Sequence, residues 1–122
     1  MKTKLLFIVI SLITFTAAAQ AVSYHKLKKG KYEIYFSENG TKIQVGDTVT
    51  FGTATSDKGF QFISQGGMPT HTTRAGAKAI ISKIKVYKNG ISLQPWIFVK
   101  GFGLVPVAID IEHALKTEEI IL

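Results

Sequence analysis

The sequence predicts an all-β domain, mainly antiparallel, folded as a small barrel or roll with one short C-terminal helix. Short runs of alternating apolar and polar residues recur along the chain, as in strands with one buried face. Asn-Gly pairs at 39–40 and 89–90 separate such runs, and this dipeptide favours tight hairpin turns. Only residues 110–116 combine helical spacing with capping residues. A chain of 122 residues suits a barrel better than a sandwich.

The N-terminus predicts a secretory signal peptide over residues 1–19. Lys2 and Lys4 give a basic start, an apolar run follows at 5–13, and small residues follow at 16–19. Cleavage after Ala19 or after Ala21 fits the preference for small residues. The apolar run is shorter than the roughly 20 residues of a membrane span, so we expect no stable membrane anchor after cleavage. The chain has no Cys, which excludes a lipid-anchored export signal.

Residues 20–122 are then one exported domain, periplasmic or secreted, without disulfides. Without Lys2 and Lys4, 13 basic residues stand against 8 acidic ones, a net charge of +5. This charge favours anionic partners such as cell-envelope polymers. Nucleic acid is not an expected partner, because the domain is exported.

The predicted strands follow the alternating runs. In chain order they cover residues 31–36, 41–45, 48–52, 60–64, 79–87 and 91–99, with a possible closing strand at 118–122. Tyr32, Ile34 and Phe36 share one face of the first strand, and Phe60 and Phe62 point inward. Residues 20–30 are polar and basic, so we expect them to fray.

The C-terminal segment combines a helix with acidic residues. Asp110 is a good N-cap, and Ile111, Ala114 and Leu115 fall on one face, so the helix would close one end of the barrel. Glu118 and Glu119 are interpreted as a solvated acidic turn.

Two interior features remain open at the sequence level. Pro95 cannot donate to a ladder and marks an edge or a bulge. Phe102, between two glycines, is interpreted as a ring that fills the barrel end, the alternative being an exposed ring that stacks on a ligand.

The segment 65–78 is the longest predicted connection, with three Gly and one Pro. Long ordered loops often carry function. Its candidate ligand-binding residues are His71, Arg74 and Lys78. The alternative is a disordered or merely tolerated insertion.

A second candidate site is the outer face of strand 79–87. Lys83, Lys85 and Tyr87 share this face by alternation. If Lys31, Lys42 and Lys100 adjoin it, the domain has a basic wall with aromatic residues between the lysines, suited to an anionic or sugar-containing polymer. Alternatively, the lysines only solvate exposed strands and block edge pairing.

No catalytic or metal motif is present in the sequence. The three histidines, His25, His71 and His113, show no ligand spacing, so we expect neither a metal site nor a cofactor. A small hydrolase or metal enzyme would require His71 and a carboxylate to come together.

The run 45–52, the second Asn-Gly hairpin and the ending 109–115 resemble small exported bacterial proteins with SH3-like barrels. The resemblance covers most of residues 20–122, and its motifs are turns, strand alternation and a helix cap. It implies an SH3-like barrel, and similar barrels mostly bind peptides or envelope polymers. It carries over no functional residue.

The sequence therefore predicts a non-enzymatic binding or accessory module that contacts an anionic cell-envelope polymer. The alternative is a protein-interaction subunit or inhibitor that places Met68 and Pro69 of segment 65–78 in the cleft of a protein partner. A small hydrolase or metal enzyme is the third hypothesis.

Overall fold

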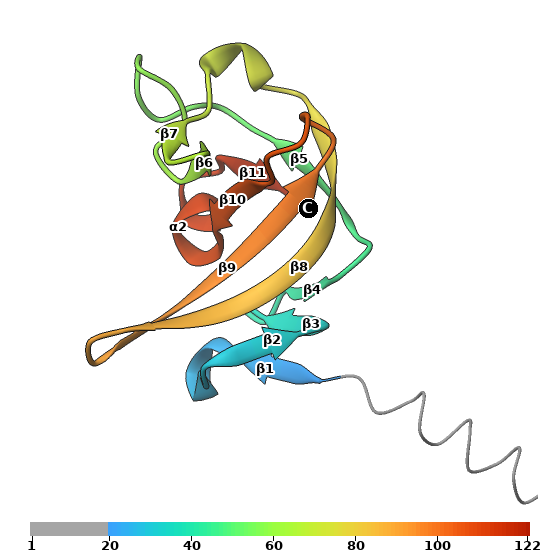
Figure 1. Cartoon of the computed structure of the whole chain (residues 1–122), viewed down its shortest axis with the longest axis vertical. Helices are drawn as coiled ribbons and strands as arrows, with labels where there is room; N and C mark the ends of the chain where they lie inside the picture. The colour runs from blue at the N-terminus through green and yellow to red at the C-terminus, as the bar shows by residue number, and fades with distance from the viewer. Residues whose placement is uncertain (1–19) are drawn as a thin grey trace, which may run out of the picture.

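The structure is a computed structural model that describes residues 20–122, so the predicted signal peptide at 1–19 lies outside the described residues. It consists of a large curled sheet shaped like half a barrel, a small second sheet, and one short helix near the C-terminus (Figure 1). Every strand pair except one is antiparallel. The predicted fold class, a mainly antiparallel small β-domain with one C-terminal helix, is confirmed.

The large sheet contains most of the strands. Its order is β11-β5-β8-β9-β10-β6-β7, and β2 also pairs with β8; the small sheet has the order β1-β3-β4. The strands are β1 (Ala21–Ser23), β2 (Gly30–Tyr32), β3 (Ile34–Phe36), β4 (Lys42–Gln44), β5 (Thr48–Phe51), β6 (Ile63–Gln65), β7 (Met68–Pro69), β8 (Lys78–Asn89), β9 (Ser92–Lys100), β10 (Val107–Asp110) and β11 (Ile120–Ile121). The helices are η1 (Tyr24–Lys26) and η2 (Thr72–Arg74), both 3-10, and α2 (Ile111–Lys116).

The two long strands β8 and β9 form the central hairpin of the large sheet, and its turn is the predicted one at Asn89 and Gly90. One edge of β8 pairs with β5 near its start and with β2 further along. A register shift between Ile81 and Lys83 separates these two regions, and such bulges bend a strand and increase its twist. The bulge lets Ile81 and Ile84 both face the core, where each is at most 1% exposed.

The core fills the space enclosed by the curled sheet, the small sheet and α2. Alternate residues of the long strands supply most of it, as alternation predicts. Phe51 packs against Phe60 and stacks on Phe102, with ring centroids 5.8 Å and 5.2 Å apart. Phe102 therefore packs against the core, as interpreted from the sequence. Pro95 lies one residue before the segment of β9 that β10 joins, so β9 is locally an edge there.

The N-terminal region differs from the sequence prediction. Residues 20–30 were expected to fray, but β1 pairs in parallel with β3 and Ser23 caps η1. The predicted first strand breaks at Glu33, because the backbone N–H groups of Glu33 and Ile34 both donate to the carbonyl of Gln20. The chain thereby passes from the large sheet into the small one.

This change of sheet alters which aromatic residue is buried. Tyr35 is fully buried, whereas Phe36 is 38% exposed, so the predicted shared face of Tyr32, Ile34 and Phe36 does not form the core. The predicted pairing of this strand with residues 41–45 is confirmed as the antiparallel pair of β3 and β4.

Segment 65–78 is not one irregular loop. Its first part completes the hairpin of β6 and β7, and η2 follows. The strand predicted at 60–64 begins only at Ile63, because the two residues before it form backbone hydrogen bonds to a side chain near the C-terminus. Backbone N–H groups of Gln61 and Phe62 donate to the carboxylate of Glu119 at 2.9 Å and 2.7 Å.

Glu119 is the largest departure from the sequence prediction, which placed it in a solvated turn. Its side chain is fully buried. Besides the two donors above, its carboxylate accepts hydrogen bonds from the backbone N–H and the hydroxyl of Thr55 at 2.9 Å and 2.7 Å. Gly52 is required beside it, since a Cβ there would lie 2.0 Å from the carbonyl oxygen of Glu118. The residues before β11 thus hold the segment 52–62 in place.

A second buried carboxylate joins α2 to the small sheet. The hydroxyl of Tyr35 donates to Oε1 of Glu112 at 2.5 Å, and Glu112 is 7% exposed. Burial, followed by the hydrogen bond to Glu112, raises the pKa of Tyr35 well above its usual value. Tyr35 therefore remains a protonated donor under all ordinary conditions.

The raised pKa of Tyr35 predicts a specific alkaline instability. An unfolded tyrosine ionises near pH 10, but the folded Tyr35 does not, so folding stability falls as the pH rises above about 10. This one group contributes a slope of up to about 1.4 kcal/mol per pH unit. In urea unfolding at pH 9 to 11, we expect Tyr35→Phe to be less stable than the unmodified protein at pH 9. Its free energy of unfolding should then decline less steeply as the pH rises. Equal slopes in both proteins would contradict this account.

Candidate anion-binding face

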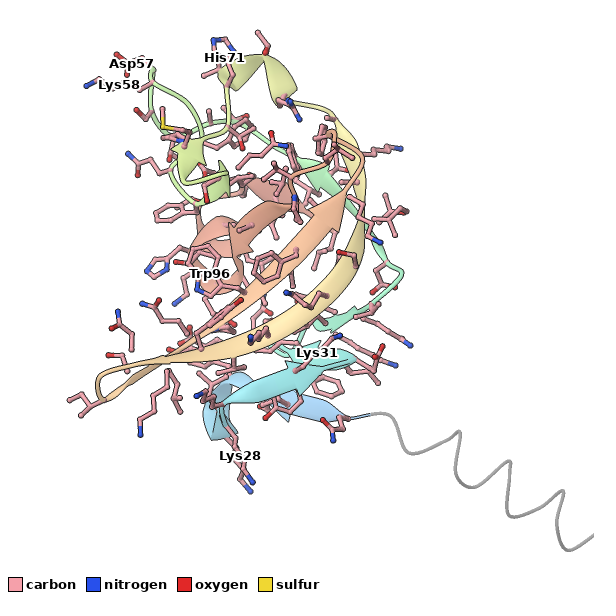
Figure 2. The ribbon with its side chains drawn as sticks, in the orientation of Figure 1. Lys28, Lys31, Asp57, Lys58, His71 and Trp96 are labelled. Atoms are coloured by element: carbon pink, nitrogen blue, oxygen red, sulfur yellow. The ribbon has the colours of Figure 1, made fainter. Side chains whose placement is uncertain are left out.

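Three lysines and three aromatic residues share the outer surface of strands β2, β8 and β9. We call this surface the basic–aromatic face; its members are Lys31, Lys83, Lys85, Tyr87, Trp96 and Phe98. The strand register brings them together. Lys31 is opposite Lys85, which is opposite Trp96, and Lys83 is opposite Phe98. Figure 2 labels Lys31 and Trp96, which come from the strands on either side of β8.

The lysines are arranged over the aromatic rings. The ammonium of Lys83 lies 4.3 Å from the ring centroid of Phe98, and that of Lys85 lies 4.7 Å from the ring centroid of Tyr87. The rings of Tyr87 and Phe98 meet edge to face at 6.4 Å. Each cation–π contact contributes about 0.5–1 kcal/mol at an exposed site. The ammonium groups are therefore partly ordered before any ligand arrives.

The positive charge of this face is not neutralised within the protein. Across residues 20–122, the ion pairs involve only His113 with Asp110 and Lys116 with Glu38. Lys31 and Lys85 are direct cross-strand neighbours, and like charges in that position are destabilising. Three neighbouring cations without a carboxylate partner form a surface that attracts anions.

The aromatic side chains of the face are not part of the main core. Tyr87, Trp96 and Phe98 are half-buried and lie outside the cluster of residues that packs in the interior. Flat rings on the solvent side of a sheet can stack on a planar or sugar-ring ligand. Trp96 is the only tryptophan in the chain, which makes its fluorescence a direct probe of this surface.

The structure divides the six ligand-binding candidates from the sequence into two groups. Lys83, Lys85 and Tyr87 lie together on the basic–aromatic face. Lys78 lies at the far end of β8, opposite Thr50. The other two belong to the region of η2, where they have local roles.

Both candidates from η2 contact other groups of the domain, although Nη1 of Arg74 is buried without a hydrogen-bond partner among residues 20–122. The ring of His71 accepts a hydrogen bond from the backbone N–H of Thr73 at 3.1 Å and so caps η2. The guanidinium of Arg74 lies 4.3 Å from the ring centroid of Phe102. Among residues 20–122, no carboxylate contacts His71, which a hydrolase or metal enzyme built on this residue would require.

Trp96 and Phe98 are members that the sequence analysis did not find. Both alternate with the buried Ile97 and Val99, which is the two-residue period of a strand with one buried face. The run 96–99 is the most apolar in the predicted strands, so the sequence alone suggests that all of it is buried. Of the other lysines considered, Lys31 joins the face, and Lys100 extends it, since it points outward two residues after Phe98 on β9. Lys42 instead lies on β4 of the small sheet.

In residues 20–122, no group of three or more His, Cys, Asp or Glu side chains is placed to hold a metal ion. No helix in the same range is long and apolar enough to cross a membrane.

Comparison with known proteins adds no independent assignment. No protein-family model matches the chain, and searches of curated proteins and of solved structures gave no match. The candidate site therefore rests on the geometry of the basic–aromatic face.

Proposed function

We propose that the protein is an exported, non-enzymatic binding module that contacts anionic cell-envelope polymers through the basic–aromatic face. One observation carries the proposal: three lysines without carboxylate partners lie beside three aromatic rings on the solvent side of one sheet. Export is the prediction of the N-terminal sequence, and it makes an envelope polymer the anionic partner that the domain meets.

The arrangement of the cations suits a chain-like ligand. Lys83 and Lys85 are two residues apart on one strand, which separates their Cα atoms by about 7 Å. Lys31 is displaced sideways by one strand, about 5 Å. A polymer with repeated carboxylate or phosphate groups can meet several of these charges at once, while its sugar rings lie against Trp96.

The test is co-sedimentation of residues 20–122 with isolated cell-envelope material over a series of salt concentrations. We expect binding at low salt that declines steadily as salt is added, because the Debye screening length shortens from about 10 Å at 0.1 M to about 3 Å at 1 M. Binding that ignores salt, or no binding at low salt, would contradict the proposal.

The protein-interaction alternative has one structural observation in its favour. Met68 lies on the edge strand β7 and is 69% exposed. A partner that inserts this residue into a cleft would lose affinity when Met68 is replaced by Ser. Binding to envelope polymers would not change in that variant, so the two functions are separable.

A further inference from the structure

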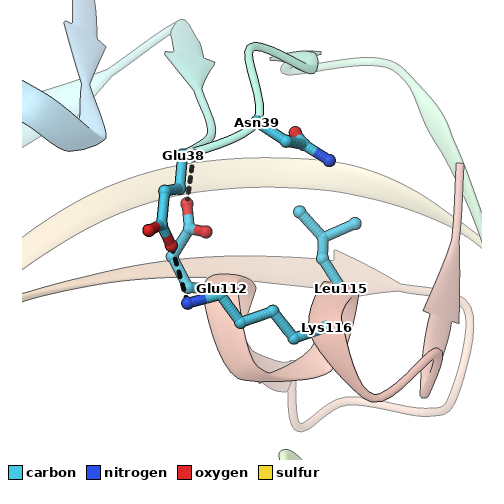
Figure 3. Close-up of a pocket in the computed structure, with 5 residues that line it drawn as sticks. All are labelled: Glu38, Asn39, Glu112, Leu115 and Lys116. Atoms are coloured by element: carbon cyan, nitrogen blue, oxygen red, sulfur yellow. Dashed lines mark hydrogen bonds and ion pairs between the residues drawn. The ribbon is translucent and has the colours of Figure 1, made fainter.

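A pocket separate from the basic–aromatic face lies between α2 and the turn that joins β3 to β4. Its volume is about 380 Å³, which is in the range of small-molecule sites. The pocket is shown in Figure 3, and its lining residues are Glu38, Asn39, Glu112, Leu115 and Lys116.

The carboxylate of Glu112 is the buried polar group of this pocket. The hydroxyl of Tyr35 and the backbone N–H of Glu38 both donate to its Oε1, at 2.5 Å and 3.1 Å. Its Oε2 accepts no hydrogen bond from residues 20–122 and is open to solvent on the side of the pocket. Figure 3 shows the carboxylate beneath Glu38, beside the space bounded by Asn39 and Leu115.

The cation that lines the pocket, Lys116, is paired with Glu38 and forms no ion pair with Glu112. The ammonium of Lys116 lies 2.6 Å from a carboxylate oxygen of Glu38. This contact lowers the pKa of Glu38 and raises the pKa of Lys116, so the two groups form a matched pair at neutral pH. The carboxylate of Glu112 therefore forms no direct ion pair with a side chain of residues 20–122.

We propose that this pocket binds a small organic cation with a primary ammonium group. The ammonium donates to Oε2 of Glu112, and the hydrocarbon part of the ligand packs against the half-buried side chain of Leu115. The position of Glu112 is fixed in advance by its two donors on Oε1, so little ordering accompanies binding.

This site does not depend on the proposed polymer-binding function. It selects the opposite charge, and it is formed by α2 and the β3–β4 turn instead of β2, β8 and β9. Loss of one function by mutation would leave the other in place.

The experiment titrates residues 20–122 with n-butylammonium chloride and follows the backbone amide resonances of residues 112–116 by NMR. We expect saturable shifts with the amine. Equal concentrations of n-butanol, which has the hydrocarbon part without the charge, and of sodium chloride should give no saturable shift. Shifts with sodium chloride alone would mean that the pocket takes inorganic cations and would overturn the proposal.

The decisive variant is Glu112→Gln, which keeps an oxygen acceptor for Tyr35 but removes the charge. Affinity for n-butylammonium should fall about tenfold or more. A hydrogen bond to a charged acceptor is stronger than one to a neutral acceptor by a free energy that corresponds to about this change in affinity. The matched control is Glu118→Gln, because Glu118 is exposed and does not line the pocket. Unchanged affinity in Glu112→Gln would contradict the proposal.

A second variant keeps the test valid if Glu112→Gln does not fold. Leu115→Ala shortens the apolar wall, so affinity for n-butylammonium should fall more than affinity for methylammonium, which barely reaches that wall. Equal effects on the two amines, or absence of any saturable shift in the unmodified protein, would overturn the proposal.

Discussion

Replacing Glu119 by Ala is expected to destabilise the domain by about 4 kcal/mol or more. The substitution leaves the backbone N–H groups of Thr55, Gln61 and Phe62 without their acceptor. Each lost hydrogen bond to a charged acceptor costs about 1.5–3 kcal/mol. Since a domain of this size has a total stability of about 5–15 kcal/mol, Glu119→Ala removes a large share of it. Urea unfolding of residues 20–122 measures the loss.

A graded series distinguishes this explanation from a general effect of mutation. Glu119→Gln can keep the acceptor for Thr55 and Gln61, but its amide NH₂ then faces the N–H of Phe62. Its cost should be intermediate, about 1–3 kcal/mol. The neighbouring, exposed Glu118→Gln should change stability by less than about 0.5 kcal/mol. A loss in Glu119→Ala no larger than in Glu118→Gln would contradict the role assigned to Glu119.

The second large effect concerns binding by the basic–aromatic face. The double variant Lys83→Gln, Lys85→Gln should bind envelope polymer at least about tenfold more weakly at low salt, because each lost cation contributes on the order of 1 kcal/mol. Its binding should also depend less steeply on salt, since fewer charges take part. Co-sedimentation over the salt series measures both quantities.

The matched control removes the same charge elsewhere. Lys42 lies on β4 of the small sheet and Lys58 in the turn before Phe60, and both are exposed. If the local array matters, Lys42→Gln with Lys58→Gln should retain most of the binding. Equal losses in the two double variants would show that only net charge is involved.

Local features of the fold were predictable from the sequence. The turn at Asn89 and Gly90, the strand from Thr48 and the helix after Asp110 depend on patterns within a few residues, and all are confirmed. Long-range features were not predictable. Glu119 binds backbone groups 57 to 64 residues earlier in the chain, and no local pattern distinguishes it from the exposed Glu118.

The same division applies to the candidate site. Alternation alone placed Lys83, Lys85 and Tyr87 on one face of a strand. The addition of Lys31, Trp96 and Phe98 needed the strand register, which depends on the bulge after Ile81 and on the break at Glu33. Composition reveals neither irregularity. Each of them decides the membership of the face, because a one-residue shift changes which face a side chain occupies.

The most direct test of the central claim uses the single tryptophan. Trp96 lies on the basic–aromatic face, and no other tryptophan contributes to the signal. Residues 20–122 are titrated with polygalacturonate, an anionic polysaccharide, and with dextran, a neutral one, while tryptophan fluorescence is recorded. We predict a saturable change with polygalacturonate that added salt reverses, and none with dextran. No change with either polymer, or the same change with both, would contradict the assignment of this face as an anion-binding surface.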